Sequence, residues 1–281
     1  MSISELPVSL LRHARLFRPD RRGQGSEWSA LEAERPYQPD VDHLQRFLTL
    51  CPGWDVAGYL PPTYPQVVAA DLHLRLLGER AFPWHPMGLV HLSNSIEILA
   101  PLRIEGEYRL SARLAPGGEH SRGVLVSIQT ALHDGDQLLW RSEAVALKMT
   151  GSGSGNDAGK SAAPMAALPA VRSMGLPEDL GRRYARVAGD LNPIHQRAWM
   201  ARFFGFRRHI LHGMWTLGWS IQPLLAGRGD FPVRVDARFL RPVFLPGMVH
   251  LGVQDEGGEL RGRLWSDSAV RPDLLFSARS G

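Results

Sequence analysis

The chain has 281 residues, of which 44% are hydrophobic and 21% are charged, and its formal net charge is +4. These proportions are typical of globular proteins and exclude a disordered or fibrous chain. The one cysteine, Cys51, cannot form a disulfide within the chain or a thiolate metal site on its own. No stretch approaches the roughly 18 consecutive apolar residues that span a bilayer, and the N-terminus lacks a signal-peptide pattern. We therefore expect a cytoplasmic protein without a membrane partner.

The basic charge comes almost entirely from arginine, because only Lys148 and Lys160 are lysines among the 32 basic residues. Arginine pairs well with phosphate and carboxylate groups, so the partner could be a nucleotide-bearing cofactor, an acidic carrier protein or a nucleic acid. The arginines are scattered apart from short pairs, and no run of five or six basic residues occurs. We therefore expect no nucleic-acid partner.

The first elements in chain order are helical. Residues 8–18 alternate leucine with arginine and predict an amphipathic docking arm. The acidic segment at residues 40–43 is interpreted as a helix start. Residues 64–77 predict a helix with Pro65 near its start and Gly78 as its C-cap. Within it, Asp71 and Arg75 are four residues apart and are expected to lie side by side on a polar face.

A linker follows the predicted strands of the first half. Residues 123–149 alternate in polarity around a turn at residues 134–136 and predict two strands. Residues 150–164 contain no large apolar side chain, so they cannot offset the entropy cost of ordering in a core. We therefore predict an N-terminal domain with its arm at residues 1–149, a flexible linker at residues 150–171 and a C-terminal domain at residues 172–281.

The two halves resemble each other, which suggests a duplication. Residues 98–106 align with residues 239–247 without a gap, and each segment runs as an alternating strand to a proline and then to a glycine. A helical stretch precedes each strand, at residues 64–77 and at residues 213–225. Each half is therefore predicted to contain one helix followed by a sheet.

The second helical stretch, residues 213–225, is apolar on nearly all sides, which is typical of a helix enclosed by a sheet. Pro223 is expected to kink this helix or to end it early. Gly218 costs about 1 kcal/mol relative to alanine in a helix interior. We therefore expect another part of the chain to approach the backbone closely at Gly218.

The most informative stretch is residues 189–195, which read Gly-Asp-Leu-Asn-Pro-Ile-His. On its own, Asp-x-Asn-Pro is an ordinary turn, and His195 would then be only the first polar residue of a following helix. The rigid Asn-Pro turn also allows Asp190 and His195 to converge on one water molecule as a general acid-base pair, with Asn192 available to orient one of them.

A second group could complete such a site. The N–H groups at Gly213, where the apolar helix is expected to begin, carry the positive end of the helix dipole. They could stabilise an oxyanion that develops on a carbonyl group. The pattern thus has two interpretations, a structural turn or an active site.

Three motifs in this order resemble the MaoC-like, (R)-specific enoyl-CoA hydratase family: residues 189–195, His212-Gly213-Met214 and residues 238–247. The resemblance is strong over residues 172–281, while residues 60–65 and 88–91 resemble the N-terminal half of bacterial 3-hydroxyacyl-thioester dehydratases. It implies an α+β double hot-dog fold, in which two curved antiparallel sheets each wrap a long central helix and join side by side.

The resemblance also implies a chemistry. The family residues that correspond to Asp190 and His195 bind the water that adds reversibly to a trans-2-enoyl thioester, giving an (R)-3-hydroxyacyl thioester in fatty acid metabolism. Gly213 corresponds to the residue that donates its N–H to the thioester carbonyl, and Asn192 to an amide that orients the substrate or the site. The thioester would be carried by coenzyme A or by an acyl carrier protein, and no cofactor is implied. Which of Asp190 and His195 moves which proton stays open.

Further candidates are weaker. Arg207 and Arg208 could bind the phosphates of coenzyme A, but an exposed, solvated pair explains them equally well. The first half has no Asp-x-Asn-Pro-x-His motif, so one active site per chain is expected. The other histidines lack metal-ligand spacing, so we expect structural histidines and no metal site. These histidines are His85, His91, His209, His212 and His250.

Two alternatives to a general hydratase remain open. One is a hydratase of a specialised branched or dicarboxylic enoyl-CoA, and the other is a non-catalytic subunit that binds acyl thioesters. An intact pair of Asp190 and His195 argues against the second, because a binding subunit needs no acid-base pair. The sequence leaves open whether the protein forms a homodimer.

Overall fold

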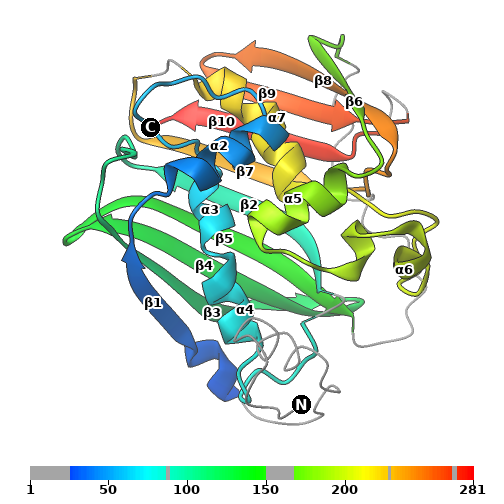
Figure 1. Ribbon diagram of the computed structural model, residues 1–281, viewed down its shortest axis with the longest axis horizontal. Helices are drawn as coiled ribbons and strands as arrows, with labels where there is room; N and C mark the ends of the chain where they lie inside the picture. Colours follow the sequence, from blue (N-terminus) through cyan, green and yellow to red (C-terminus); the bar gives the residue numbers. More distant parts are fainter. Residues whose placement is uncertain (1–25, 87–88, 150–167, 227–228, 268–270) are drawn as a thin grey trace.

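The computed structural model describes residues 26–86, 89–149, 168–226, 229–267 and 271–281 (Figure 1). The predicted arm at residues 8–18 and most of the predicted linker lie outside these ranges. Ten strands form one antiparallel sheet in the order β1-β3-β4-β5-β2-β7-β10-β9-β8-β6. The main helices lie against one face of this sheet (Figure 1). Among the described residues, no helix is both long enough and apolar enough to cross a membrane.

The first half of the chain supplies one end of the sheet. Its elements are η3 (Ser26–Ala30), β1 (Glu32–Tyr37), α2 (Val41–Leu50), α3 (Tyr64–Val68), α4 (Ala70–Leu77), β2 (Leu89–Ile98), β3 (Tyr108–His120), β4 (Gly123–Asp134) and β5 (Gln137–Met149). The second half supplies β6 (Arg172–Leu176), α5 (Leu180–Ala188), η5 (Pro193–His195), α6 (Ala198–Arg202), α7 (Gly213–Leu225), β7 (Val233–Phe239), β8 (Gly247–Glu256), β9 (Glu259–Trp265) and β10 (Leu274–Ser280).

The two halves repeat the same connectivity, as a duplication predicts. The first half is ordered β1-β3-β4-β5-β2, and the second is ordered β6-β8-β9-β10-β7 when read inward from its own edge. The aligned segments at residues 98–106 and 239–247 begin where β2 and β7 end, so they follow these strands and are not strands themselves as predicted. The strands β2 and β7 pair with each other from Ser93 opposite Arg238 to Ile98 opposite Val233. The expected double hot-dog fold is confirmed, with its two sheets joined into one.

Helix α7 is enclosed, as its sequence predicts. Trp215 and Trp219 are fully buried, and the helix continues past Pro223 to Leu225. A Cβ added at Gly218 would lie 3.0 Å from both Cys51 Sγ and Thr63 Oγ1. The expected close approach at this glycine is therefore made by the first half of the chain.

The helix predicted over residues 64–77 is divided. It breaks at Ala69, whose ψ of −2° is far from the helical value, so α3 and α4 are separate helices. Asp71, which was expected to lie beside Arg75 on a polar face, binds Arg35 of β1 with an N–O distance of 2.9 Å. The ion-pair partner of Asp71 thus comes from a strand that is distant in the sequence and not from the same helix.

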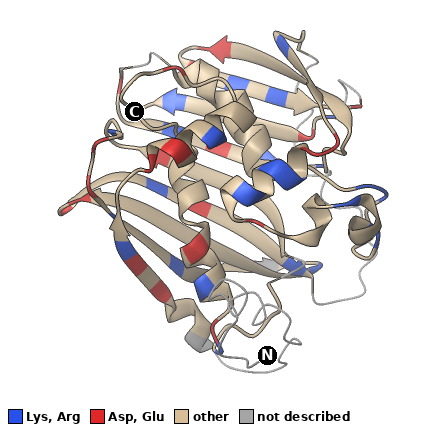
Figure 2. Ribbon diagram, in the orientation of Figure 1, with Lys and Arg blue, Asp and Glu red and all other residues tan. Residues whose placement is uncertain are grey.

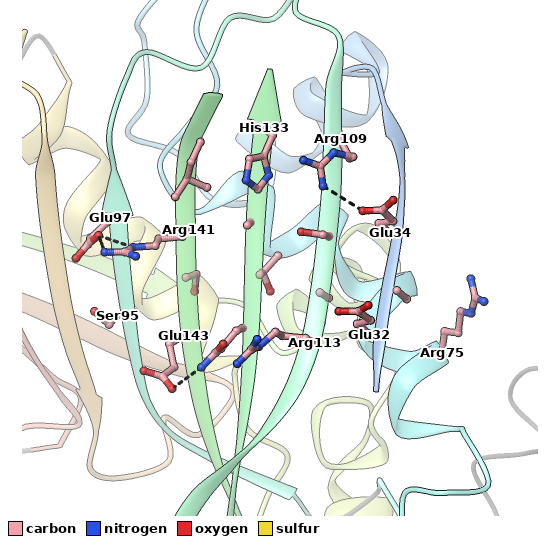
Figure 3. A pocket seen from close by; sticks show the side chains of 18 of the residues that line it. Glu32, Glu34, Arg75, Ser95, Glu97, Arg109, Arg113, His133, Arg141 and Glu143 are labelled. Atoms are coloured by element: carbon pink, nitrogen blue, oxygen red, sulfur yellow. Dashed lines mark hydrogen bonds and ion pairs between the residues drawn. The ribbon is translucent and has the colours of Figure 1, made fainter. Parts of the chain in front are cut away.

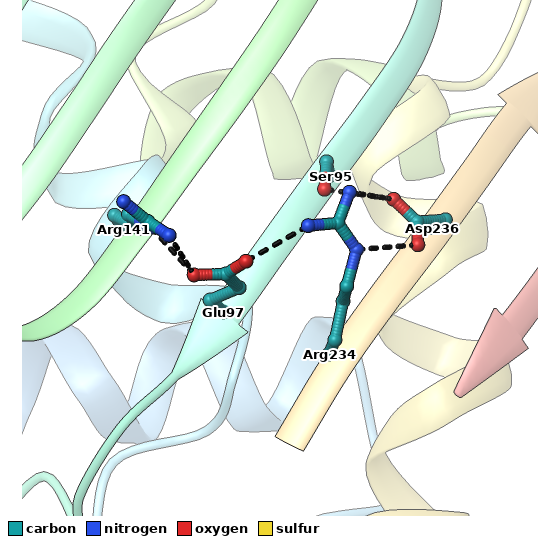
Figure 4. Close-up of polar contacts among 5 residues, drawn as sticks. All are labelled: Ser95, Glu97, Arg141, Arg234 and Asp236. Carbon is teal, nitrogen blue, oxygen red and sulfur yellow. Dashed lines mark hydrogen bonds and ion pairs between the residues drawn. The ribbon is translucent and has the colours of Figure 1, made fainter. Parts of the chain in front are cut away.

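Charged side chains cover the outer face of the first half of the sheet, on residues that alternate with the buried ones (Figure 3). They line a hollow of about 1010 Å³. At the junction of the halves, Arg234 of β7 lies 2.8 Å from Glu97 of β2 and 2.7 Å from Asp236 (Figure 4). Glu97 also binds Arg141 of β5. The charges pair across three strands, and the hollow includes none of the predicted catalytic residues.

Candidate active site

The predicted motif forms a tight loop after helix α5. Gly189 ends α5 with a φ of +70°, a left-handed conformation that favours glycine, and a Cβ there would lie 3.1 Å from Ala70 of α4. The backbone N–H of Asn192 donates to Asp190 Oδ1 at 3.1 Å, which fixes the carboxyl group against its own loop. The loop therefore holds Asp190 at the end of α5, next to the first half of the chain.

The Asn-Pro turn positions His195. The side-chain oxygen of Asn192 accepts a hydrogen bond from the N–H of Ile194 at 3.3 Å and caps the one-turn helix η5, which ends at His195. Pro193 suits the first position of this turn because no hydrogen bond is required from its nitrogen. Asn192 thus holds the backbone turn that carries His195, and its role in orienting the substrate or the site stays a prediction.

The hydrogen bonds of His195 determine which of its ring nitrogens can act as a base. Nδ1 lies 2.8 Å from the carbonyl oxygen of Ile210, and a carbonyl only accepts, so Nδ1 carries the proton. In the neutral ring Nε2 then presents a lone pair, and it lies 3.8 Å from Asp190 Oδ2. The imidazole and the carboxylate therefore converge, as the functional interpretation of the motif predicts.

Nε2 of His195 and Oδ2 of Asp190 are close enough for one water molecule, lying beside the line that joins them, to contact both. Both Nε2 of His195 and Oδ2 of Asp190 can contact it at an ordinary hydrogen-bond length of about 2.8 Å. The side chain of Asp190 is 51% exposed, while that of His195 is 8% exposed. A water held by the pair would thus have one side toward solvent and one side toward the buried imidazole.

His212, which was expected to be a structural histidine, belongs to the same cluster. Its ring stacks on His195 with centroids 3.6 Å apart, and its Nε2 donates to the backbone carbonyl of Asp190 at 3.2 Å. Folding brings these residues together because β7 and α7 pack beside the loop. By contrast, His209 binds the carbonyl of Glu178 and His250 binds Ser173, as structural histidines do.

This cluster is also the place where the described residues could hold a metal ion. One ligand atom from each of Asp190, His195 and His212 lies within 4.8 Å of the others, contrary to the expectation that no histidine has such spacing. However, His212 Nε2 already donates its proton to a carbonyl. In that tautomer the lone pair of His212 is on Nδ1, which is buried and has no hydrogen-bond partner among the described residues, so the expected absence of a metal site stays a prediction.

The electrostatics favour an ionised aspartate beside neutral histidines. Loss of solvation would raise the pKa of Asp190, but His195, His212 and the N–H of Asn192 outweigh it and place this pKa below its ordinary value. Burial lowers the pKa of His195, against the opposing effect of Asp190. Burial also lowers the pKa of His212 to about 3. The pair is therefore poised as carboxylate and neutral base at neutral pH.

Gly213 begins helix α7, as predicted, and directly follows His212 in the chain. The first N–H groups of a helix, here that of Gly213, have no partner within the helix. A Cβ at this position would lie 3.0 Å from the ring of Phe239, so the phenylalanine packs directly on the start of α7. The cluster of Asp190, His195 and His212 thus lies at the N-terminus of α7.

The two predicted phosphate-binding arginines have partners in the protein. Arg207 lies 3.5 Å from Asp267 and over the ring of Phe244, and Arg208 donates to the carbonyl of Pro246 at 3.1 Å. The side chain of Arg207 is still 62% exposed. Arginines gather on α5 and around α6 (Figure 2), so this side of the site is basic. A role for Arg207 and Arg208 in binding phosphate stays a prediction.

Two further residues, not indicated by the sequence, lie near Asp190 and His195. The ring of Tyr184 is buried 5.0 Å from that of His212. His91 of β2 packs on Phe239 and is close enough to Asp190 for each to affect the pKa of the other. In the sequence His91 was part of a resemblance and was otherwise expected to be a structural histidine, which gave no sign that it lies near Asp190.

Comparisons with known proteins agree with this geometry. The family model for a MaoC like domain matches residues 160–266. The chain is 30% identical over 201 residues to 3-hydroxyacyl-thioester dehydratase X of Mycobacterium tuberculosis, covering 71% of each protein. It is 27% identical over 228 residues to enoyl-CoA hydratase ChsH3 of that organism, covering 74% of this chain and 75% of the relative. It superposes on the crystal structure of HtdX from Mycobacterium tuberculosis with a TM-score of 0.76 and 25% identity, covering 89% of this chain and 100% of the other.

Proposed function

Because this chain belongs to the family of MaoC-like dehydratases, we propose that it adds water reversibly to trans-2-enoyl thioesters and forms (R)-3-hydroxyacyl thioesters. The observation that carries this proposal is the convergence of Asp190 Oδ2 and His195 Nε2, 3.8 Å apart, beside the N-terminus of α7. The printed names of two relatives, a 3-hydroxyacyl-thioester dehydratase and an enoyl-CoA hydratase, describe the two directions of this reaction.

In the hydration direction, the water bound by the pair attacks C3 of the substrate. His195 Nε2 takes a proton from this water as its oxygen bonds to C3. The electrons of the C2–C3 double bond move toward C2 and the thioester carbonyl, and the N–H of Gly213 stabilises the negative charge on the carbonyl oxygen. Return of a proton to C2 completes the addition, and the reverse sequence eliminates water.

The electrostatics suggest how the proton roles divide. Asp190, with its low pKa, accepts a hydrogen bond from the water and orients it without taking the proton. His195, neutral and with its lone pair on Nε2, is the better base. We therefore assign proton transfer to His195 and orientation of the water to Asp190.

We also propose that the acyl group is bound to an anionic carrier. Coenzyme A and acyl carrier protein both present a thioester on an anionic carrier, and the exposed arginines around α6 provide complementary charge. Arg207 is the nearest candidate in the sequence to Gly213 with an exposed side chain. A specialised branched or dicarboxylic substrate would use the same catalytic pair.

The test follows the absorbance of the enoyl thioester as the protein is mixed with crotonyl-CoA and with a medium-chain trans-2-enoyl-CoA. We expect the band to decay with the wild type and the rate to fall by about 10²–10⁴-fold in Asp190→Asn and His195→Ala, the usual range for general acid-base groups. The matched control is Asp179→Asn, on the surface at the start of α5, which should behave like the wild type.

Two readouts complete this test. In the dehydration direction, (R)-3-hydroxyacyl-CoA should be consumed and the (S) isomer should not. Unchanged rates in Asp190→Asn and His195→Ala would contradict the mechanism. Turnover of only branched or dicarboxylic enoyl-CoA would support the specialised alternative, and binding without turnover of any thioester would support the non-catalytic one.

A further inference from the structure

A bulge in β2 turns one side chain of the first half toward the helices. In the pairing of β2 with β5, Ile96 lies opposite Ser142 and Asn94 opposite Ala144, and these residues are buried under the helices. The register shifts between His91 and Ser93, so His91 lies opposite Ala146, which is also buried. Paired residues share a face of the sheet, and a bulge is a known way to redirect a side chain near an active site.

From this position His91 reaches the catalytic half. Its ring lies 4.6 Å from that of Phe239, measured between centroids. Phe239 in turn packs on Gly213, where a Cβ would be 3.0 Å from the phenylalanine ring. His91, Phe239 and Gly213 therefore form a continuous row of contacts that ends at the N-terminus of α7.

The polar end of His91 is not used within the described part of the protein. Its Nε2 is buried and has no hydrogen-bond partner among the residues that the structure describes. Burial lowers the pKa of His91 to about 4, against the opposing effects of the Ser93 backbone and the Asp190 charge, so the ring is neutral. Such a buried, unpaired polar atom destabilises a folded protein, and a functional role is one explanation for its presence.

We propose that His91, on the half of the chain that lacks the catalytic motif, contacts the substrate through Nε2 at its thioester end. The inference rests on the proposed function, in which the thioester carbonyl binds at Gly213. Because the row of contacts from His91 ends at Gly213, His91 contributes equally to substrates with short and long acyl chains. The active site is then built from both halves, and the first half is more than a structural partner.

The experiment compares His91→Leu with the wild type on short-, medium- and long-chain trans-2-enoyl-CoA. We expect kcat/KM to fall by about tenfold for every chain length, as expected when one hydrogen bond in a buried site is lost. We also expect the Tm to stay the same or rise, because leucine removes the unpaired polar atom. His91→Gln places an amide near the position of Nε2 and should recover most of kcat/KM.

A matched control separates this role from a structural one. His73 of α4 is also buried with its pKa lowered to about 4, but its Nε2 binds Thr130 Oγ1 at 2.8 Å. His73→Leu should therefore lower the Tm and leave kcat/KM within about threefold of the wild type. The two leucine variants thus change stability in different directions.

The possible outcomes distinguish a failure of the proposed function from a failure of the role inferred for His91. A wild type that hydrates no enoyl thioester overturns the proposed function, and the role of His91 with it. An active wild type with an equally active His91→Leu overturns only the inference. A loss of kcat/KM that grows with chain length, or a loss that glutamine does not restore together with a lower Tm, also overturns it.

Discussion

The imidazole rings of His195 and His212 stack with their centroids 3.6 Å apart and their planes inclined by 24°. His212 covers one face of His195 and shields it from water, and its Nε2 holds the backbone of Asp190. Both members of the proposed acid-base pair therefore depend on one neighbour. This neighbour directly precedes Gly213, so the pair and the oxyanion site are connected through a single residue.

His212→Ala should change the pH dependence of the reaction as well as its rate. Removing the stacked ring admits water to His195 and returns the pKa of His195 toward its ordinary value, because burial is the main cause of its lowering. We expect kcat/KM to fall by about 10–100-fold and its acid limb to move to higher pH. A pH profile of kcat/KM measures both. His250→Ala, near the far edge of the sheet, is the control, and an unmoved limb in His212→Ala would refute the shielding role.

The wild type should keep its activity well below neutral pH. His195 acts as a base only when neutral, and its folded pKa lies below the ordinary 6.5. We therefore expect kcat/KM to be flat from pH 8 to about 6.5 and to fall only as the pH drops through the lowered pKa of His195. Kinetics in overlapping buffers at constant ionic strength check this. A fall that begins above pH 7 would mean that His195 is not the base.

The stability of the fold should also decrease with acid. His73 and His91 have pKa values of about 4 in the folded state and about 6.5 when unfolded. Between these values the unfolded chain binds more protons, so the free energy of unfolding falls as the pH is lowered from about 6.5 to 4. Each group contributes up to about 1.4 kcal/mol per pKa unit. Urea unfolding across this range measures the loss, and His73→Leu should reduce the slope.

Gly218→Ala should destabilise the protein through overpacking. The new methyl group would lie 3.0 Å from Cys51 Sγ and Thr63 Oγ1, closer than ordinary van der Waals contact, and both atoms are buried. The gain in helix propensity of about 1 kcal/mol is then outweighed, and we expect a net loss of about 1–2 kcal/mol in urea unfolding. Gly175→Ala is the control, because nothing lies within 4 Å of its added Cβ. A more stable Gly218→Ala would contradict the close packing.

The residues that could be predicted from the sequence are those whose signal is local. Asp190, Asn192 and His195 lie within one short motif, and Gly218 stands out because glycine is unfavourable inside a helix. The roles of His212 and His91 depend on which side chains meet after folding. His91 in particular faces the helices only because β2 has a bulge, and a regular alternation would have placed it on the outer face.

The ion pair of Asp71 could not be predicted from the sequence either. Asp71 was expected to lie beside Arg75, four residues along the helix, since this spacing is the only one that a sequence shows directly. In the structure Arg35 instead binds Asp71 and also donates to the carbonyl of Val68. A strand that runs beside the helix offers a better hydrogen-bonding geometry than a flexible neighbour, and its position is set by the tertiary fold.

Arg234→Met should weaken the junction between the two halves of the sheet. The guanidinium binds Asp236 through two nitrogens and reaches across to Glu97, while Ser95 donates to Asp236 (Figure 4). Methionine keeps much of the packing but leaves both carboxylates without this partner. Because the side chain of Arg234 is 40% exposed, solvent screens the pairs, and we expect a loss of about 1 kcal/mol.

The salt dependence of this loss identifies its origin. In 1 M NaCl the Debye length is about 3 Å, so the difference between Arg234→Met and the wild type in urea unfolding should shrink. Arg109→Met, which removes a single exposed pair with Glu34, is the matched control and should cost less than about 0.5 kcal/mol. If both variants lose the same stability, and salt changes neither, then the network at the junction contributes no more than an ordinary surface pair. The halves would in that case be held together by the β2–β7 backbone pairing and the buried contacts of α7.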